Sequence, residues 1–317
     1  MTTWDVVIPF LGPLKDLFAD PDISDILVNG GGTVFVERAG RLSEVPDAFV
    51  SEKALQVAVR NIARALGDEI SEESPLLDSR LPDGSRVAAV FSPCSVDGTT
   101  LAIRKFHGKR YSATELVRVG MLTDALLQVL GSAVANRENI LISGATGSGK
   151  TTLLTALASF MRPEERVVVI EDTSEIQLDQ KNLVRLEARR EQPGLAAVTM
   201  RDLLRTSLRL RPDRILLGEV RGGDAFDLLQ ALNTGHAGTL STIHAESATR
   251  AISRFTTCVL MSDVELPYRA IRANIAETLH LLVHTARRDG LRIVTQVLRI
   301  RRYEPGEDRY EFETIHA

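Results

Sequence analysis

The chain has 317 residues, of which 44% are hydrophobic and 25% are charged, and its net charge is −4. This composition is that of a globular protein with room for two domains, and it excludes an intrinsically disordered chain. The negative net charge gives no overall attraction to nucleic acid or to an anionic membrane. Cys94 and Cys258 lack the spacing of a metal site, so we interpret them as thiols in a reducing cytoplasm, with a disulfide as the alternative.

The first 13 residues contain an apolar run, residues 6–11, but they lack basic residues and are interrupted by Pro9 and Pro13. This pattern is not that of a secretory signal peptide. No stretch of the chain approaches the roughly 18 uninterrupted apolar residues of a membrane-spanning helix. We therefore expect any membrane role to depend on partner proteins or on surface contact.

The region from Leu14 to Phe106 has a mixed pattern of strands and helices. Strands are predicted over residues 23–28, 33–37, 86–91 and 99–104, with turns at residues 29–32 and 82–84. Apolar residues at helical spacing predict a helix over residues 54–65, and Gly67 is a suitable C-terminal stop. These hairpins and this helix predict a small α+β domain with an antiparallel sheet, which we assign to residues 1–106.

A linker is predicted over residues 107–115, because its first residues are polar, basic and contain a glycine. Ser112 and Glu115 have the spacing of a capping box, and a longer helix is predicted over residues 124–135. Strands without alternation, at residues 139–143, 167–170 and 215–217, are separated by helical patterns. This arrangement is typical of a parallel sheet covered on both faces. Residues 116–317 are therefore predicted to form an α/β domain with a parallel-rich sheet.

The sequence from Gly144 to Thr151 matches the phosphate-binding loop G-x-x-x-x-G-K-[ST] at every position. An apolar strand precedes it and a helical pattern follows it, which is the context that the motif needs. Its glycines let backbone N–H groups turn towards a polyphosphate at the positive end of the helix. Lys150 is expected to reach the β- and γ-phosphates, and the Thr151 hydroxyl to hold Mg²⁺. The predicted residues for binding ATP or ADP are Gly144, Ala145, Thr146, Gly147, Ser148, Gly149, Lys150, Thr151 and Thr152.

The strand predicted at residues 167–170 runs directly into three carboxylates, Glu171, Asp172 and Glu175. The carboxyl edge of an open α/β sheet is where ligands bind. A carboxylate beside Mg²⁺ can orient and deprotonate an attacking water, whereas the alternative is a solvated acidic turn.

A second predicted strand, residues 215–217, is followed by Gly218 and Glu219. An acid after an apolar strand commonly holds Mg²⁺ opposite a phosphate loop. Many such ATPases carry an aspartate where this chain has Gly218, so Glu219 must supply the charge alone.

Two histidines, His236 and His244, flank a short predicted strand centred on Ser241. Their spacing is not that of a metal site. They are either structural residues or sensors of the γ-phosphate, because they border the predicted nucleotide-binding sheet.

Arg201, Arg205 and Arg209 stand four residues apart on a predicted helix and therefore share one face. Arg214 and Arg221 follow closely. Such a run forms either a solvated face or an arginine stripe that reaches phosphate or a neighbouring subunit, and Arg221 is our candidate for the site itself. Recognition of bases is poorly supported, because aromatic residues make up only 5% of the chain and none interleaves these arginines.

Four ordered motifs resemble those of the type II/IV secretion ATPases, the hexameric motors of secretion, conjugation and pilus machines. They are the phosphate loop, an Asp box at residues 170–176, a signature at residues 208–221 and a His box at residues 235–245. The resemblance covers most of the chain and implies a RecA-like ATPase domain. It implies that Glu175 is the catalytic base and that Glu219 holds Mg²⁺ through water. It also implies that His236 and His244 couple the γ-phosphate state to subunit movement.

Three N-terminal segments, residues 24–29, 81–86 and 102–105, are similar to those of the conjugation and tight-adherence branch. In that branch a PAS-like N-terminal domain caps the nucleotide, so the resemblance implies that Arg86 and Arg104 contact phosphate. We expect no four-cysteine zinc module and no long extra N-terminal domain, both of which are common in type II secretion and pilus-extension motors. The chain also reads Gly-Gly-Asp at residues 222–224, where many pilus motors have an aspartate directly after the arginine. These departures favour conjugation or type IV secretion, with tight-adherence pili next.

The resemblance therefore implies a cytoplasmic, Mg²⁺-dependent ATPase that works as a homo-hexamer at the inner membrane, where platform or coupling proteins hold it peripherally. Direct nucleic-acid binding is not expected. The main alternative is a nucleic-acid translocase or helicase on the same ATPase core, which salt-dependent DNA binding would favour. A nucleotide-bound scaffold without turnover is the second alternative. No Asn-Lys-x-Asp tetrad is present, which disfavours a GTPase.

Overall fold

The computed structural model describes residues 14–38, 40–81, 83–106, 110–191 and 195–317. The chain divides into two compact units, Met1–Lys109 and Arg110–Ala317. Three expectations fall outside the described residues: the apolar N-terminal run, Pro82 of the predicted turn, and residues 107–109 of the predicted linker. The end of that linker is already helical, because Ser112 caps a helix that begins at Ala113.

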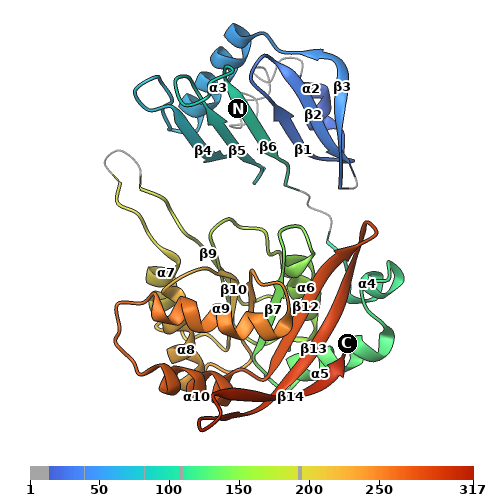
Figure 1. The fold of residues 1–317 in the computed structure, drawn as a ribbon, viewed down its shortest axis with the longest axis vertical. Coiled ribbons are helices and arrows are strands. Elements are labelled where there is room, and N and C mark those ends of the chain that lie inside the picture. The colour runs from blue at the N-terminus through green and yellow to red at the C-terminus, as the bar shows by residue number, and fades with distance from the viewer. Residues whose placement is uncertain (1–13, 39, 82, 107–109, 192–194) are drawn as a thin grey trace. The chain divides into compact units, whose positions relative to one another are not determined.

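The N-terminal unit is built on a six-stranded sheet (Figure 1). Its strands follow the order β3-β2-β1-β6-β5-β4, and every neighbouring pair is antiparallel. The pairs β1–β2 and β5–β6 confirm the predicted hairpins, whereas β3, which contains Pro46, and the short β4 were not predicted. The elements are α2 (Lys15–Ala19), β1 (Ile23–Val28), β2 (Thr33–Arg38), β3 (Arg41–Phe49), α3 (Glu52–Ala65), β4 (Leu76–Arg80), β5 (Arg86–Val90) and β6 (Thr100–Arg104).

Helix α3 packs on this sheet through apolar residues at helical spacing. Leu55, Val59 and Ile62 are buried in one cluster with the inward-facing residues of the strands. Ser51 caps the start of the helix by accepting a hydrogen bond from a backbone N–H of the first turn. Gly67 follows its end with φ 79°, a left-handed conformation that glycine adopts without strain. The predicted helix and its stop signal are confirmed.

The C-terminal unit contains an eight-stranded sheet of order β14-β13-β12-β7-β11-β10-β8-β9. The six strands from β12 to β9 in this order run parallel, and β13 and β14 add antiparallel strands beyond β12. The elements are α4 (Ala113–Arg118), α5 (Asp124–Ala135), β7 (Ile140–Gly144), α6 (Lys150–Leu157), η2 (Ala158–Phe160), β8 (Val167–Glu171), β9 (Leu183–Glu187), α7 (Met200–Ser207), β10 (Arg214–Val220), α8 (Asp224–Asn233), β11 (Leu240–Ile243), α9 (Ala248–Leu260), α10 (Tyr268–Thr278), β12 (Leu281–Arg288), β13 (Leu291–Glu304) and β14 (Arg309–His316).

Helices cover both faces of this sheet (Figure 1). Ile140 and Ile142 of β7 are buried in the cluster that includes α4, α5 and α6, whereas Leu141 is buried in the cluster of α7 to α10. Because both faces are covered, the central strands β7 and β8 are buried at every position rather than at alternating positions. The predicted α/β fold with a parallel-rich sheet is therefore confirmed.

One expectation for this unit needs correction, and three of its strands were not predicted. Helix α7 ends at Ser207, so Arg209 lies beyond the helix that carries Arg201 and Arg205. The chain turns there, since Arg211 has φ 55° and the proline that follows it cannot continue a helix. The long strands β12, β13 and β14 were not predicted, because charged residues on β13 interrupt its apolar pattern.

Candidate functional site

The predicted phosphate loop connects the carboxyl end of β7 to the start of α6. Gly147 and Gly149 have φ 72° and 95°, in the left-handed region that favours glycine. At Gly144 the limit is space, because an added Cβ would lie 2.3 Å from the Thr285 carbonyl oxygen and 2.4 Å from Ser148 Oγ. The loop thus needs glycine for conformation and for close packing, and it leads into the positive end of α6.

Lys150 begins α6 and is only 7% exposed. Its Nζ donates hydrogen bonds to the carbonyl oxygens of Gly144 and Ala145, each at 3.0 Å. Burial lowers the pKa of this ammonium, while the charges of Glu219 and Glu175 act in the opposite direction. A phosphate in the loop would compete with the two carbonyls for the same N–H donors, so the lysine is placed to exchange one set of acceptors for another.

Two residues outside the motif hold the loop from β12 and β13. Thr285 Oγ1 donates to the Ser143 carbonyl oxygen at 3.1 Å and lies 2.9 Å from Ser148 Oγ. Arg292 Nε donates to the Gly147 carbonyl oxygen at 2.9 Å. Sequence reasoning missed both residues, because Arg292 lies 145 positions beyond its partner and neither belongs to a motif.

Glu219 lies near the end of β10, at the edge that also carries the phosphate loop, because the strands are parallel. Arg221 approaches its two carboxylate oxygens at 3.0 and 3.1 Å, and His244 Nε2 lies 3.1 Å from Oε1. Arg221 also donates to Asp172 at 2.9 Å. Burial acts to raise the pKa of Glu219, but the hydrogen bond and charge of Arg221 hold it below its usual value. Burial, together with the charge of Lys150, lowers the pKa of His244, which favours the neutral imidazole near pH 7.

The three predicted carboxylates at the end of β8 and in the turn that follows it have different environments. Glu171 is 3% exposed, and its Oε1 accepts hydrogen bonds from the backbone N–H groups of Glu175 and Ile176, each at 2.9 Å. Burial raises the pKa of Glu171 to about 7, against the effect of these two hydrogen bonds. Asp172 pairs with Arg221, and the side chain of Glu175 is exposed. Glu175 is thus the carboxylate of this group that solvent can reach most readily.

The surroundings of Gly218 explain why this position, which precedes Glu219, does not carry an aspartate. An ideal Cβ at Gly218 would lie 2.9 Å from Glu171 Cγ, which is closer than carbon atoms approach in folded proteins. The Thr242 hydroxyl donates to the Gly218 carbonyl oxygen at 2.5 Å, which holds the strand at this point. The Cγ methylene of Glu171 therefore occupies the space that a side chain at position 218 would need.

The donor set at this edge fits Mg²⁺ that is bound together with nucleotide phosphates. Within the described ranges, no group of three or more His, Cys, Asp or Glu side chains could hold a metal ion by itself. Mg²⁺ usually keeps several waters and binds through one or two protein groups plus substrate phosphates. The Thr151 hydroxyl on α6 and the Glu219 carboxylate on β10 provide oxygen donors of this kind.

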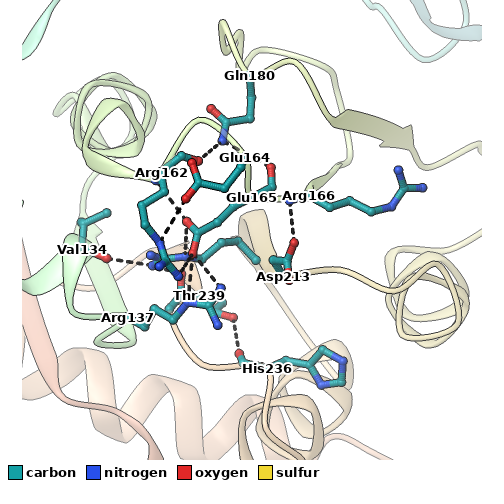
Figure 2. A network of polar contacts seen from close by, with 12 residues as sticks. Val134, Arg137, Arg162, Glu164, Glu165, Arg166, Gln180, Asp213, His236 and Thr239 are labelled. Atoms are coloured by element: carbon teal, nitrogen blue, oxygen red, sulfur yellow. Dashed lines mark hydrogen bonds and ion pairs between the residues drawn. The ribbon is translucent and has the colours of Figure 1, made fainter.

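The structure separates the two histidines. His236 precedes β11 and His244 follows it, so they lie at opposite ends of the parallel strands. His236 lies beside a polar network (Figure 2), and its carbonyl oxygen accepts a hydrogen bond from Thr239 at 3.2 Å. The structure therefore brings His244, and not His236, to the edge that carries the phosphate loop of the same chain.

That polar network, in which Glu165 and Arg214 are buried, joins several elements at the ends of the strands opposite to the phosphate loop (Figure 2). The Glu165 carboxylate accepts hydrogen bonds from Arg137, Arg162 and Arg214 at 2.7, 3.3 and 3.1 Å. Arg214 is fully buried at the start of β10, and it also donates to the Val134 carbonyl oxygen at 2.8 Å. The expectation that Arg214 continues an exposed arginine run is wrong, because its guanidinium is a core group with a buried carboxylate partner.

The arginine stripe on α7 is engaged by carboxylates of its own unit. Arg201 and Arg205 both pair with Asp227 of α8, at 2.6 and 2.7 Å. Arg201 also pairs with Asp263 at 2.8 Å. These contacts join α7 to α8 and to the segment after α9, so they support a packing role for the two arginines.

Arg86 and Arg104, the predicted phosphate contacts of the smaller domain, are direct cross-strand neighbours on β5 and β6. Arg104 Nε donates to Asp25 Oδ1 at 2.9 Å, and Arg86 lies 3.9 Å from Asp78 Oδ1. The structure thus brings these two arginines together within the N-terminal unit.

Comparison with known proteins identifies the family. A family model described as type II/IV secretion system protein matches residues 11–291. The chain is 35% identical over 298 residues to the probable conjugal transfer protein TrbB of Sinorhizobium fredii. The matched region covers 93% of this chain and 88% of that protein. It is 37% identical over 294 residues to the type IV secretion system protein PtlH of Bordetella pertussis, with coverage of 85% and 87%.

Among solved structures, the chain resembles the VirB11 ATPase from the Brucella suis type IV secretion system in complex with sulphate. The TM-score is 0.51 and the identity 30%, over 94% of this chain and 95% of that one. Across the part of the chain that the structure describes, none of the helices has the length and apolar character needed to cross a membrane. The chain therefore belongs to the type II/IV secretion system protein family, in its conjugation and type IV secretion branch, and is a nucleotide-binding ATPase of a secretion machine.

Proposed function

We propose that this chain hydrolyses ATP with Mg²⁺ and works as a homo-hexameric motor at the inner membrane, where it powers a conjugation or type IV secretion machine. The observation that carries this proposal is the convergence of Lys150, Glu219 and His244 at one edge of the parallel sheet. The names of its relatives, conjugal transfer protein and type IV secretion system protein, support the choice of machine. Platform or coupling proteins hold the motor at the membrane in this proposal.

Each residue of the edge has a role in hydrolysis. The N–H groups of the loop and Lys150 bind the β- and γ-phosphates, while Thr151 and Glu219 hold Mg²⁺, the latter through water. Bound Mg²⁺ neutralises charge that develops on the phosphates. Glu175 orients the attacking water and accepts its proton, since its carboxylate is exposed and follows the neighbouring strand of the same edge.

His244 and Arg221 connect Glu219 to the rest of the unit. Both contact the Glu219 carboxylate, and Arg221 also reaches Asp172 beside the turn that carries Glu175. A shift of the Glu219 carboxylate would alter both contacts at once. We assign the sensing of phosphate loss to His244 and Arg221. His236 is not included, because it precedes β11 and so lies at the other end of that strand from His244.

The N-terminal unit completes the proposed motor. Arg86 and Arg104 supply contacts to phosphate from that unit, consistent with their cross-strand pairing. In this proposal, loss of the γ-phosphate moves the two units about the linker near Phe106 to Tyr111, which converts hydrolysis into a rigid-body displacement.

The test is steady-state ATP hydrolysis against protein concentration, with the mass measured by light scattering on the same samples. Specific activity should rise as hexamers form and should vanish when Mg²⁺ is chelated. Glu175→Gln should still bind ATP but lose about 10²-fold or more in kcat, the usual contribution of a general base. Glu246→Gln is the matched control, because it makes the same change at an exposed carboxylate paired with Arg250. Activity that is independent of assembly, or full activity in Glu175→Gln, would contradict the proposal.

A further inference from the structure

Glu171 makes an unusual pair of contacts for a residue at the end of a buried strand. A single carboxylate oxygen accepts the N–H groups of two successive residues, Glu175 and Ile176, both at 2.9 Å. Two bonds to one acceptor fix the path of the backbone at the residue that carries the proposed general base. The exposed side chain of Glu175 is carried by this backbone, so the position of its carboxylate depends on how firmly the backbone is held.

Glu171 also rests against the strand that carries Glu219. Its Cγ occupies the space beside Gly218, where an added Cβ would approach it to 2.9 Å. Thr242 on β11 donates to the carbonyl oxygen of Gly218, so the backbone of β10 is held at this point as well. The buried carboxylate therefore lies between the backbone that leads to Glu219 and the turn that leads to Glu175.

We propose that Glu171 is a positioning residue that fixes the backbone of Glu175 relative to Glu219. This inference rests on the proposed function, since it assigns Glu175 the task of activating water. Misplacement of a catalytic group by about 1 Å can cost about 10²-fold in rate. The role needs an oxygen acceptor at position 171 but no charge, because the contacts are hydrogen bonds from neutral amides. If Glu171 only filled the core, any side chain at position 171 that keeps the fold would leave kcat unchanged.

Three variants separate these possibilities. Glu171→Ala removes the acceptor and should lower kcat about tenfold or more, with KM for ATP changed less than about twofold. Glu171→Gln keeps a carbonyl oxygen that can accept both N–H groups, and it should retain at least about one third of wild-type kcat. Val169→Ala is the matched control, because it truncates a buried residue of the same strand that has no bond to the turn. It should lower stability and leave kcat unchanged.

Hydrogen exchange of the Glu175 and Ile176 amides provides a readout that does not depend on turnover. Their exchange should be about fivefold to tenfold faster in Glu171→Ala than in Glu171→Gln or Val169→Ala. Equal kcat in Glu171→Ala and Val169→Ala, with an active wild type, would overturn the inference and leave the proposed function intact. A wild type without ATP hydrolysis would overturn the proposed function, and unchanged exchange in Glu171→Ala would separately overturn the positioning of the turn.

Discussion

Replacing Gly218 with alanine is expected to destabilise the C-terminal unit. The new Cβ would lie 2.9 Å from Glu171 Cγ and 3.5 Å from both Glu171 Cβ and the Ile170 carbonyl oxygen. Relaxed carbon contacts need about 3.5 Å or more. The structure must therefore absorb roughly 0.6 Å, either by moving the two strands apart or by turning the Glu171 side chain away.

Both responses have a similar cost. Overpacking of a well-packed core costs about 1–3 kcal/mol. If Glu171 turns away, it loses two hydrogen bonds from backbone N–H groups, each worth about 0.5–1.5 kcal/mol. Alanine in place of glycine recovers about 0.4–1 kcal/mol by restricting the unfolded chain. We expect a net loss of about 1–2 kcal/mol, which lowers Tm by roughly 2–8 °C.

Thermal unfolding of the full chain, followed by far-ultraviolet circular dichroism, measures this loss. Gly222→Ala is the control, because among the residues described the atom nearest to its added Cβ is Asp224 Oδ1 at 3.8 Å. Glu171→Ala removes the clashing Cγ, so the Gly218→Ala change should cost little in that background. The double-mutant cycle should therefore give a coupling of about 1 kcal/mol or more. Additive effects, or a Gly218→Ala variant as stable as Gly222→Ala, would refute the steric reasoning.

Burial raises the pKa of Glu171 from 4.5 to about 7, so folding favours its protonated form. The free energy of unfolding that this group contributes is therefore lost as the pH rises from about 4.5 to about 7. In urea titrations, the advantage of Glu171→Gln over wild type should grow by about 3 kcal/mol from about pH 4 to pH 8, and a constant difference would contradict the shift. In the buried network, Glu165→Ala should cost about 3–5 kcal/mol because it leaves Arg214 uncompensated. Arg214→Met should cost about 2 kcal/mol less, since Glu165 keeps two other guanidinium partners. Urea unfolding ranks the two variants, and the reverse order would count against this account. Thr285→Val removes a hydroxyl that holds the phosphate loop and should raise the Kd for ATP about fivefold, whereas Thr285→Ser should bind like wild type in calorimetry.

The phosphate loop could be predicted from the sequence because its chemistry is local. The loop conformation depends on glycines within a few positions of Lys150, and the strand and helix that flank it have their own apolar patterns. The edge location of Glu219 and Asp172 also followed from sequence. Parallel strands end on the same side of a sheet, so acids that directly follow two such strands must lie at one edge.

Other features depended on contacts between distant parts of the chain. His236 and His244 look like a pair in the sequence, but the strand between them places them at opposite ends of the parallel strands. Arg214 follows other arginines in the sequence, yet its position at the start of a central strand makes it a core residue. Gly218 has no explanation in its own segment, because the atom that excludes a side chain there belongs to Glu171.

The sequence by itself determined the loop, the order of most elements and the residue types available for phosphate and metal chemistry, because these follow from short-range backbone geometry and apolar spacing. Only the tertiary structure decided which strands are neighbours, since this depends on burying both faces of the sheet under helices from the whole unit. That choice brings Thr285 and Arg292 to the phosphate loop and packs the Glu171 side chain, at the end of β8, against Gly218 of β10. The support of the site therefore comes from long-range packing, whereas its chemistry comes from local motifs.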